Sequence, residues 1–284
     1  MSLPAAYPPA PDPLPHPVVD NHTHLDHARR GEAPLDVEEA LGAAAATGVT
    51  RMVQIGCDLE AARWTVDVVG RFPALLGGVA LHPTEATRHA AAGGLEEALA
   101  EIERLAAHPR VRVVGETGLD HYWVRDDEGR AAQEASFRRH VDLARRTGKV
   151  LQIHDRDAHD DVLRVLHEEG APERTVFHCF SGDAAMARHC AGRGWYLSFA
   201  GTLTFKNAEP LRDALRAVPL EQVLVETDAP YLTPSPHRGR PNAGYLVPLT
   251  VRCMAEVLGK DLEEVCATLD ATSERLYGPW DLCD

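Results

Sequence analysis

The hydrophobic positions of the chain fall into short runs rich in β-branched residues, and longer segments of helical periodicity lie between them. This alternation is typical of repeated βα units around a parallel sheet. The nearly continuous hydrophobicity of each run indicates a strand that is covered on both faces. The predicted strands are Val18–Asn21, Arg51–Ile55, Leu76–Ala80, Val111–Val114, Val150–Ile153, Thr175–Phe177, Trp195–Phe199 and Val223–Val225.

Helices are predicted between these strands, and three of them are followed by a glycine, which suits a left-handed helix end. An open doubly wound sheet shows the same alternation, but eight strands favour closure into a barrel. We therefore predict an α/β fold, a single-domain (β/α)8 TIM barrel over residues 18–284. The predicted helices include Asp36–Thr47, Glu60–Arg71, Leu95–Ala107, Gln133–Thr147, Ala158–Glu169 and Pro210–Ala217.

The first 17 residues differ from the rest, because seven of them are prolines. We expect residues 1–17 to form a flexible, extended N-terminal segment outside the core. This segment has neither the basic nor the apolar region of a signal peptide, and no apolar run of the chain reaches the length of a membrane span. The six cysteines have no C-x-x-C spacing, so we predict reduced thiols and a cytoplasmic location.

The net charge limits how the chain can contact nucleic acid. It has 43 acidic and 29 basic residues and a formal charge of −14, which argues against a broad positive surface that grips duplex DNA. Any contact with nucleic acid is therefore expected to be local.

Residues that can bind metal recur at the carboxyl ends of the predicted strands, where parallel barrels build their active sites. The first strand ends in Asp20-Asn21-His22-Thr23-His24, and alternate residues of an extended chain point the same way, so both imidazoles can reach one ion. A single residue of this kind is commonly a hydrogen-bonded structural group, but six together are hard to explain by packing, because uncompensated imidazoles and carboxylates are costly to bury. The six are His22, His24, Glu116, His154, His178 and Asp228.

The number of ligands favours two ions. A four-coordinate site uses two histidines and two carboxylates, which leaves His154 and His178 for a second ion. The two carboxylate oxygens of Glu116 allow it to bridge both, as in two-metal hydrolases. We expect one ion at His22, His24, Glu116 and Asp228, and the other at Glu116, His154 and His178. Imidazole-rich sites suit zinc or manganese, and magnesium stays open.

These segments resemble the TatD-type deoxyribonucleases of the metallo-dependent hydrolase superfamily, over Val18 to about Gly278. The shared motifs are D-N-H-T-H-L-D from Asp20, G-E-T-G-L-D from Gly115, I-H-D-R-D-A from Ile153, F-H-C-F-S-G from Phe177, S-F-A-G-T-L-T-F-K-N-A from Ser198 and E-T-D-A-P-Y-L from Glu226. The resemblance implies a barrel nuclease that uses divalent metal, usually magnesium, to hydrolyse DNA, commonly as an exonuclease and sometimes at abasic sites.

The chain departs from the family pattern at three places. Thr84 stands where the family often has a second histidine, the usual acidic residue after Asn242 is missing, and Ser273 stands where a late asparagine is often found. None of these departures removes a predicted ligand, so they bear on substrate preference more than on metal chemistry.

We predict Asp228 and Glu116 as the catalytic residues, with Asp228 as general base beside the first ion. Arg156, two residues past His154, could hold a phosphate, with a surface salt bridge as the alternative. His82 could line the substrate cleft or cap its strand. Three further predicted substrate-binding residues lie in the loops after strands seven and eight, which often bind phosphate in barrels. They are Lys206, Arg238 and Arg240, and a solvated loop is the alternative for the two arginines.

Other histidines and an aromatic residue have weaker signals. His140, His159 and His167 fall on predicted helices, and we expect them at the surface. Tyr231 could stack on a base or pack against its own loop.

Two other functions stay open. An amidohydrolase could use the same metal cradle on a C–N or ester bond, but such enzymes often have lysine at the bridging position, where this chain has Glu116. A non-catalytic metal-binding or scaffolding barrel is the other. The expected partner is DNA, as ends or single strands; no membrane and no obligate protein partner are inferred.

Overall fold

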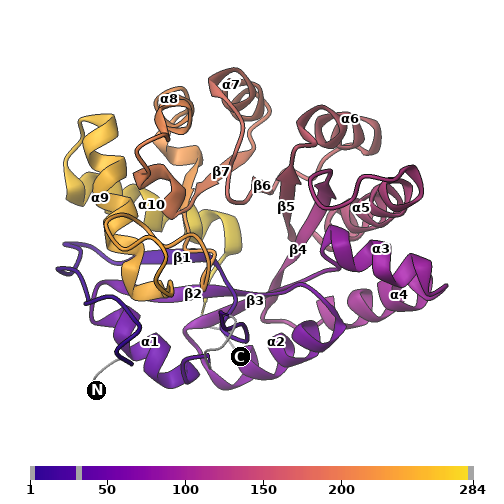
Figure 1. Ribbon diagram of the computed structural model, residues 1–284, viewed down its shortest axis with the longest axis horizontal. Coiled ribbons are helices and arrows are strands. Elements are labelled where there is room, and N and C mark those ends of the chain that lie inside the picture. The colour runs from indigo at the N-terminus through magenta and orange to yellow at the C-terminus, as the bar shows by residue number, and fades with distance from the viewer. Residues whose placement is uncertain (1–3, 30–33, 281–284) are drawn as a thin grey trace. The chain divides into compact units, whose positions relative to one another are not determined.

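A computed structural model describes residues 4–29 and 34–280 of the chain. Its eight parallel strands form one sheet in chain order, with helices between consecutive strands (Figure 1). This arrangement confirms the predicted (β/α)8 TIM barrel. The strands are β1 (Val18–Thr23), β2 (Val49–Gly56), β3 (Leu75–Val79), β4 (Val111–Asp120), β5 (Val150–Arg156), β6 (Thr175–Phe177), β7 (Tyr196–Phe199) and β8 (Val223–Val225).

The structure contains the six helices predicted above and four further α-helices in its described residues. Asp residues cap several of them; Asp36, for example, accepts hydrogen bonds from the first backbone N–H groups of its helix. The helices are α1 (Val37–Ala45), α2 (Leu59–Arg71), α3 (Pro83–Ala91), α4 (Leu95–Ala106), α5 (Asp127–Thr147), α6 (His159–Glu169), α7 (Ala184–Gly192), α8 (Glu209–Arg216), α9 (Val247–Leu258) and α10 (Leu262–Tyr277). None of the described helices is both long and apolar enough to cross a membrane.

Strand β4 is longer than predicted, because it continues through Gly115 and Gly118 to Asp120. Glycine usually weakens a strand, so the prediction ended at Val114. Here the glycines allow a close approach to β5: Gly118 has a φ of +146°, and a Cβ on it would lie 2.0 Å from the His154 carbonyl oxygen. The extension carries Glu116 and Asp120 alongside β5.

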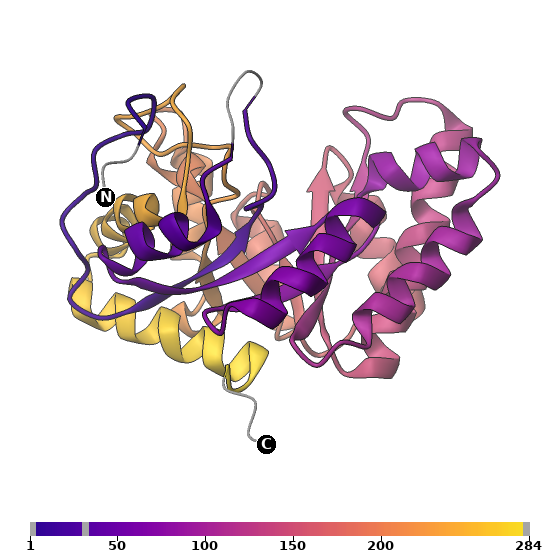
Figure 2. The ribbon, with the colours of Figure 1, turned by 90° about the horizontal axis from the view of Figure 1, so that it is seen from below.

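The chain forms two compact units, and each is described by itself. The first unit comprises residues 1–54 and 182–284. In it, α10 packs against β1 and β8 (Figure 2), and the core contains large buried side chains such as Tyr245 and Tyr277.

The N-terminal segment, predicted to be flexible and outside the core, lies against the first unit from residue 4 onward. Leu14 is buried, and the hydroxyl of Tyr245 donates to the carbonyl of Pro8 at 2.7 Å. Arg252 donates to the carbonyls of Asp12 and Pro13. Prolines leave the carbonyl oxygens of an extended segment without regular partners, so side chains of the barrel bind them instead.

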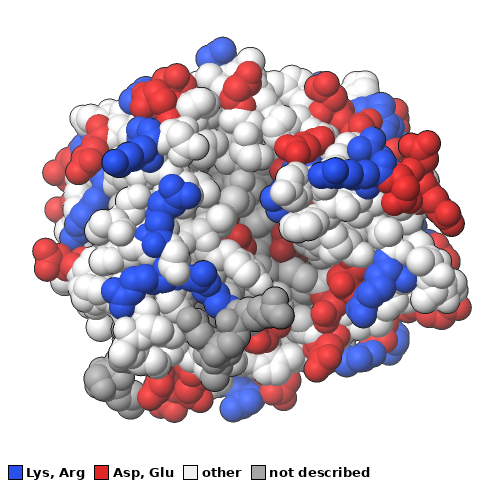
Figure 3. Space-filling model, viewed as in Figure 1, with Lys and Arg blue, Asp and Glu red and all other residues white. Residues whose placement is uncertain are grey.

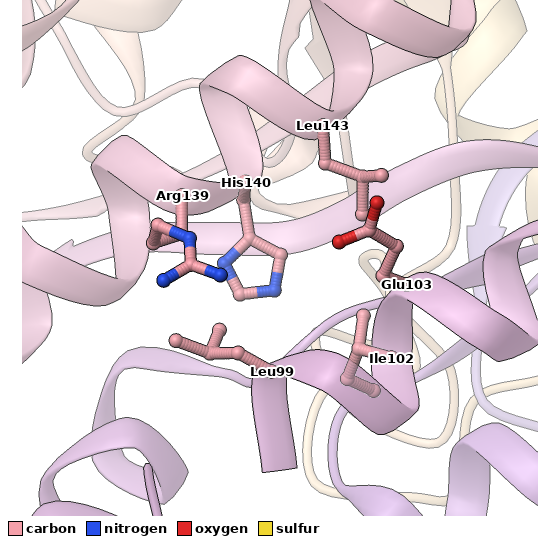
Figure 4. Close-up of a pocket in the computed structure, with 6 residues that line it drawn as sticks. All are labelled: Leu99, Ile102, Glu103, Arg139, His140 and Leu143. Atoms are coloured by element: carbon pink, nitrogen blue, oxygen red, sulfur yellow. The ribbon is translucent and has the colours of Figure 1, made fainter. Parts of the chain in front are cut away.

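The second unit comprises residues 55–181. Within it, α5 packs against β4, and α3 and α4 pack against α5 (Figure 1). A small pocket between α4 and α5 is lined by His140 among other residues (Figure 4).

The prediction that His140 lies at the surface is wrong, because its side chain is buried. Its Nδ1 donates to the Ser136 carbonyl at 2.8 Å, and its Nε2 accepts from the Leu81 N–H at 3.3 Å. His167, in contrast, is exposed as expected. A helix has buried and exposed faces, and the polar character of histidine does not tell which face it occupies.

Candidate metal centre

In the first unit, His22, His24 and Asp228 form a group that we call the β1–β8 cluster. The two Nε2 atoms of the histidines lie 3.2 Å apart, and Oδ1 of Asp228 lies 3.4 Å from Nε2 of His24 and 3.8 Å from Nε2 of His22. In a tetrahedral site with metal–nitrogen bonds of about 2.0 Å, ligand atoms lie about 3.3 Å apart. The spacing of this cluster therefore fits a single ion.

Backbone hydrogen bonds hold the β1–β8 cluster together. The Asp228 N–H donates to the His22 carbonyl, and the His24 N–H donates to the Ala229 carbonyl, both at 2.9 Å. Asp228 has a φ of +54°, a left-handed conformation in which residues other than glycine, asparagine and aspartate are strained. Aspartate tolerates this conformation, and the Asp228 carboxylate lies close to the imidazoles of His22 and His24.

Asp20 supports this cluster from within β1. Its carboxylate accepts from the N–H of Thr227 at 2.8 Å and from the hydroxyl of Thr227 at 2.6 Å. Burial raises the pKa of Asp20 to about 7, although the hydrogen bonds from Thr227 favour the charged form. Asp20 thus ties the ligand-bearing ends of β1 and β8 to each other.

Ser273, one of the departures from the family pattern, lies beneath the same strand end. It is fully buried, and its hydroxyl lies 3.1 Å from Oδ1 of Asn21 and 3.0 Å from the Leu269 carbonyl. Asn21 in turn donates to the Val225 carbonyl of β8 at 2.9 Å. The Ser273 hydroxyl therefore helps to hold the strand ends that carry the β1–β8 cluster.

In the second unit, Glu116, His154 and His178 form a group that we call the β4–β6 cluster. One carboxylate oxygen of Glu116, Oε2, lies 3.0 Å from Nδ1 of His154 and 2.9 Å from Nε2 of His178. All three side chains are largely buried. A buried carboxylate that faces two imidazole nitrogens is a donor set for a divalent cation.

The protonation of the β4–β6 cluster follows from these contacts. Burial by itself would raise the pKa of Glu116, but the charge of His178 and the hydrogen bonds of His154 and His178 hold that pKa well below its usual value. Burial works against the charged form of His154 as well, yet its hydrogen bonds with Asp120 and Glu116 raise its pKa. The carboxylate of Glu116 is therefore ionised, as a metal ligand must be.

His82 lies beside this cluster at the end of β3. Its ring centroid is 4.4 Å from that of His154, and its donor atom lies within 4.8 Å of those of Glu116 and His154. Its Nδ1 is already engaged by Thr84, with the hydroxyl at 2.8 Å and the N–H at 3.2 Å. Burial, reinforced by His154, lowers the pKa of His82 to about 3, so the ring is neutral.

Two residues of this region were not among the predicted site residues. Asp120 ends β4 and accepts from Nε2 of His154 at 3.1 Å, the carboxylate–histidine arrangement that orients metal-binding imidazoles. Cys57 follows β2, and its thiol lies 3.1 Å from Oε1 of Glu116. Both stand at strand ends, so the rule that found the other residues could have found these. The five cysteines in the described part of the chain form no disulfide with one another.

The predicted substrate-binding residues are dispersed over the two units. Arg156 is exposed and its guanidinium lies over the Tyr122 ring. In the first unit, Lys206 is exposed, and Arg238 lies 3.9 Å from the centroid of Phe205. Arg240 donates to the carbonyls of Ala5, Ala6 and Tyr7 in the N-terminal segment.

Comparison with known proteins identifies the family of this chain. The family model described as TatD related DNase matches residues 19–278, which include both clusters. The chain belongs to the TatD-related DNase family. This TatD-family chain is 49% identical over 264 residues to the Mycobacterium tuberculosis protein named uncharacterized metal-dependent hydrolase TatD, covering 92% of this chain and 98% of the relative. It is 36% identical over 261 residues to Escherichia coli YcfH, named an uncharacterized metal-dependent hydrolase, covering 92% and 95%.

Solved structures of TatD relatives share the fold. The crystal structure of the TatD homologue YjjV from Escherichia coli matches with a TM-score of 0.83 at 25% identity, covering 92% of this chain and 98% of that one. A TatD-family hydrolase from Entamoeba histolytica matches with a TM-score of 0.81 at 18% identity, covering 94% and 99%. The TatD-family chain is thus a metal-dependent hydrolase, and its described residues include groups of histidine, cysteine and acidic side chains that could bind metal.

Proposed function

We propose that this TatD-family protein is a divalent-metal-dependent deoxyribonuclease that hydrolyses DNA phosphodiester bonds from ends or single strands. The observation that carries the proposal is the composition of the two clusters: each combines imidazole nitrogens with an acidic oxygen at the carboxyl ends of barrel strands. Family membership supports a nuclease over other hydrolases.

The proposed nuclease takes two ions, one in each cluster. His22, His24 and Asp228 would supply the ligands of one ion, and Glu116, His154 and His178 those of the other. Bound divalent cations lower the pKa of water and neutralise charge on a phosphate. The donors are mainly nitrogen, which favours zinc or manganese over magnesium, and the Cys57 thiol beside Glu116 favours a softer ion still.

Asp228 is the proposed general base, and the exposures of the two acids support this choice. The side chain of Asp228 is 16% exposed, whereas that of Glu116 is 7% exposed and its pKa is held well below the usual value by the histidines around it. A carboxylate with so low a pKa is a poor proton acceptor. Glu116 is therefore suited to ligation, and Asp228 can pass a proton to solvent.

The distribution of charge supports ends or single strands as substrates. Acidic and basic side chains are interspersed on the face seen in Figure 3, and the formal charge of the chain is −14. Affinity for long duplex DNA depends on many phosphate contacts. A chain with this charge has to hold its substrate through a few local contacts.

The test couples metal analysis to digestion of labelled DNA. Purified protein is loaded with Zn²⁺, Mn²⁺ or Mg²⁺, its metal content is measured, and a single-stranded oligonucleotide, a frayed duplex and a supercoiled plasmid are compared. We expect two ions per chain and a ladder of shortened single strands. Faster cleavage of internal plasmid sites than of frayed ends would refute the end preference. Hydrolysis of an amide or lactone panel without cleavage of DNA or bis-nitrophenyl phosphate would assign an amidohydrolase instead.

A further inference from the structure

Two large aromatic side chains are exposed directly after β4. Trp123 is 65% exposed and Tyr122 is 40% exposed. In the described part of the chain, Tyr231 is the only other large hydrophobic residue that is exposed, at 47%. Exposure of an indole to water costs free energy, so two exposed aromatic rings at a strand end indicate a surface that binds a ligand or partner.

The two rings form an ordered pair with an arginine above them. Their centroids lie 5.0 Å apart at an interplanar angle of 86°. The guanidinium carbon of Arg156 lies 4.1 Å from the Tyr122 centroid and 5.7 Å from that of Trp123. Within residues 4–29 and 34–280, Arg156 makes no ion pair with a carboxylate, so its charge is free to meet an anion. We call Tyr122, Trp123 and Arg156 the aromatic platform.

The platform is joined to the β4–β6 cluster through Asp120. One oxygen of Asp120 accepts from the backbone N–H of Trp123 at 2.8 Å, and the other accepts from Nε2 of His154 at 3.1 Å. On β5, Arg156 follows His154 by two residues and pairs in register with Asp120. The residues of the platform and a proposed metal ligand are therefore held by one carboxylate and one strand pair, all within the second unit.

The chemistry of the platform distinguishes among possible occupants. Two aromatic faces with a guanidinium provide stacking surfaces and an anion contact in one place, which is how proteins hold unpaired nucleobases and their phosphates. A protein partner would gain little from so small an apolar area. The arginine also gives local positive charge to a chain whose net charge is −14, so a polyanion is attracted here rather than over the whole surface.

We propose that the aromatic platform stacks the unpaired bases at the end of a single-stranded nucleic acid, with Arg156 holding an adjacent phosphate. This inference rests on the proposed nuclease function and deepens it, because it assigns the substrate class to specific residues. Stacking is open to every base, so the platform selects unpaired ends and not sequence. A blunt duplex has to fray before its terminal bases can reach the rings.

The experiment measures binding of DNA with and without terminal bases. Fluorescence anisotropy is recorded for a labelled dT oligonucleotide and for two versions that carry abasic residues at the last two positions, one at the 5′ end and one at the 3′ end. All proteins carry Asp228→Asn, so that the DNA is not consumed. Stacking contributes about 1–3 kcal/mol per base, and 1.4 kcal/mol is tenfold in affinity. We expect one of the abasic ends to bind about tenfold more weakly than the intact strand.

The platform variants Trp123→Ala and Tyr122→Ala should bind the intact strand about tenfold more weakly and no longer distinguish it from the abasic one. Phe72→Ala is the matched control. An arginine lies over the Phe72 ring too, because the Arg71 guanidinium carbon is 5.5 Å from the ring centroid. Phe72, however, precedes β3 and so lies at the amino end of a strand. This control should bind as the parent does. Quenching of tryptophan fluorescence by the intact strand should disappear in Trp123→Phe.

Each outcome decides the proposal. Equal affinity of parent and Trp123→Ala for the intact strand, or loss of affinity that is the same for intact and abasic strands, would overturn base stacking at this surface. Failure of the nuclease proposal has a different signature: wild-type protein with any of the three metals would leave the oligonucleotide uncut. A wild-type protein that cuts DNA with the same KM as Trp123→Ala would refute the platform and leave the nuclease intact.

Discussion

At the scale of single residues, two buried acids at strand ends are tuned in opposite directions by their neighbours. Asp20 accepts hydrogen bonds only from neutral groups, and burial raises its pKa to about 7. Glu116 is buried too, but the adjacent imidazoles of His178 and His154 overcome that burial and hold its pKa well below the usual value. Asp20 therefore has a structural role, through its hydrogen bonds with Thr227. Glu116 stays ionised, which suits it to bind a cation.

Replacing Glu116 with Gln tests this assignment with little change in shape. Gln has one acceptor oxygen and no charge, so we expect the β4–β6 cluster to lose its ion, metal content to fall to about one ion per chain and turnover to drop by about 100-fold. Elemental analysis after dialysis measures the first effect. Asp142→Asn is the control, because Asp142 lies on α5 and pairs with Arg145 and Arg146, and the metal content of this variant should match wild type. Two full equivalents in Glu116→Gln would argue against Glu116 as a metal ligand.

Asp228→Asn tests the proposed general base. Asn tolerates the left-handed conformation that Asp228 adopts, with its φ of +54°, so the fold and thermal stability should be retained. Loss of a general base lowers rates by about 10²–10⁴, and kcat on an oligonucleotide should fall within that range. Circular dichroism and single-turnover kinetics provide the two readouts. If the variant cleaves DNA at a near-normal rate, Asp228 is not the base.

At the scale of secondary structure, the sequence predicted the eight strands because β-branched runs buried on both faces are a local signal. It did not predict the continuation of β4 through Gly115 and Gly118, because the reason for those glycines lies on β5 and is not local. Asp120 was missed as a partner of His154 for the same reason: their contact depends on the register of two strands. The hydrophobic pattern of a single segment does not predict which residues of two neighbouring strands lie opposite each other.

Gly118→Ala should damage this pairing and the cluster beside it. A methyl group would lie 2.0 Å from the His154 carbonyl oxygen, and the φ of +146° is strained for alanine. We expect a lower midpoint of thermal unfolding and weaker metal binding in the same variant. Gly93→Ala is the control, since Gly93 also has a positive φ, +74°, but has open space where the Cβ would be. That substitution should cost only about 1–2 kcal/mol and leave metal binding unchanged.

At the scale of the whole molecule, burial decides how the folded state responds to pH. His140 was expected at the surface, yet it lies in the core of the second unit with both ring nitrogens bonded in the neutral form. Burial lowers its pKa from 6.5 to about 4. The sequence could place His140 on a helix but not on its buried face, because that face is set by packing against α4 and β4.

The shifted pKa of His140 makes folding stability depend on pH in a defined window. In the unfolded chain this histidine takes up a proton as the pH falls through 6.5, but in the folded protein it stays neutral until about pH 4. Acidification therefore favours the unfolded state across that window and lowers the free energy of unfolding by roughly 3 kcal/mol in total. Below about pH 4 this contribution does not change further.

His140→Gln removes this titration, so the fall in the free energy of unfolding between pH 7.5 and 5 should be smaller than in wild type by roughly 2 kcal/mol. Urea unfolding at both pH values, with chelator present, measures the difference; His82 titrates alike in both proteins and cancels. The exposed His167 gives the control, because His167→Gln should keep the wild-type pH dependence. Equal pH dependence in wild type and His140→Gln would mean that the buried ring is not the group that titrates.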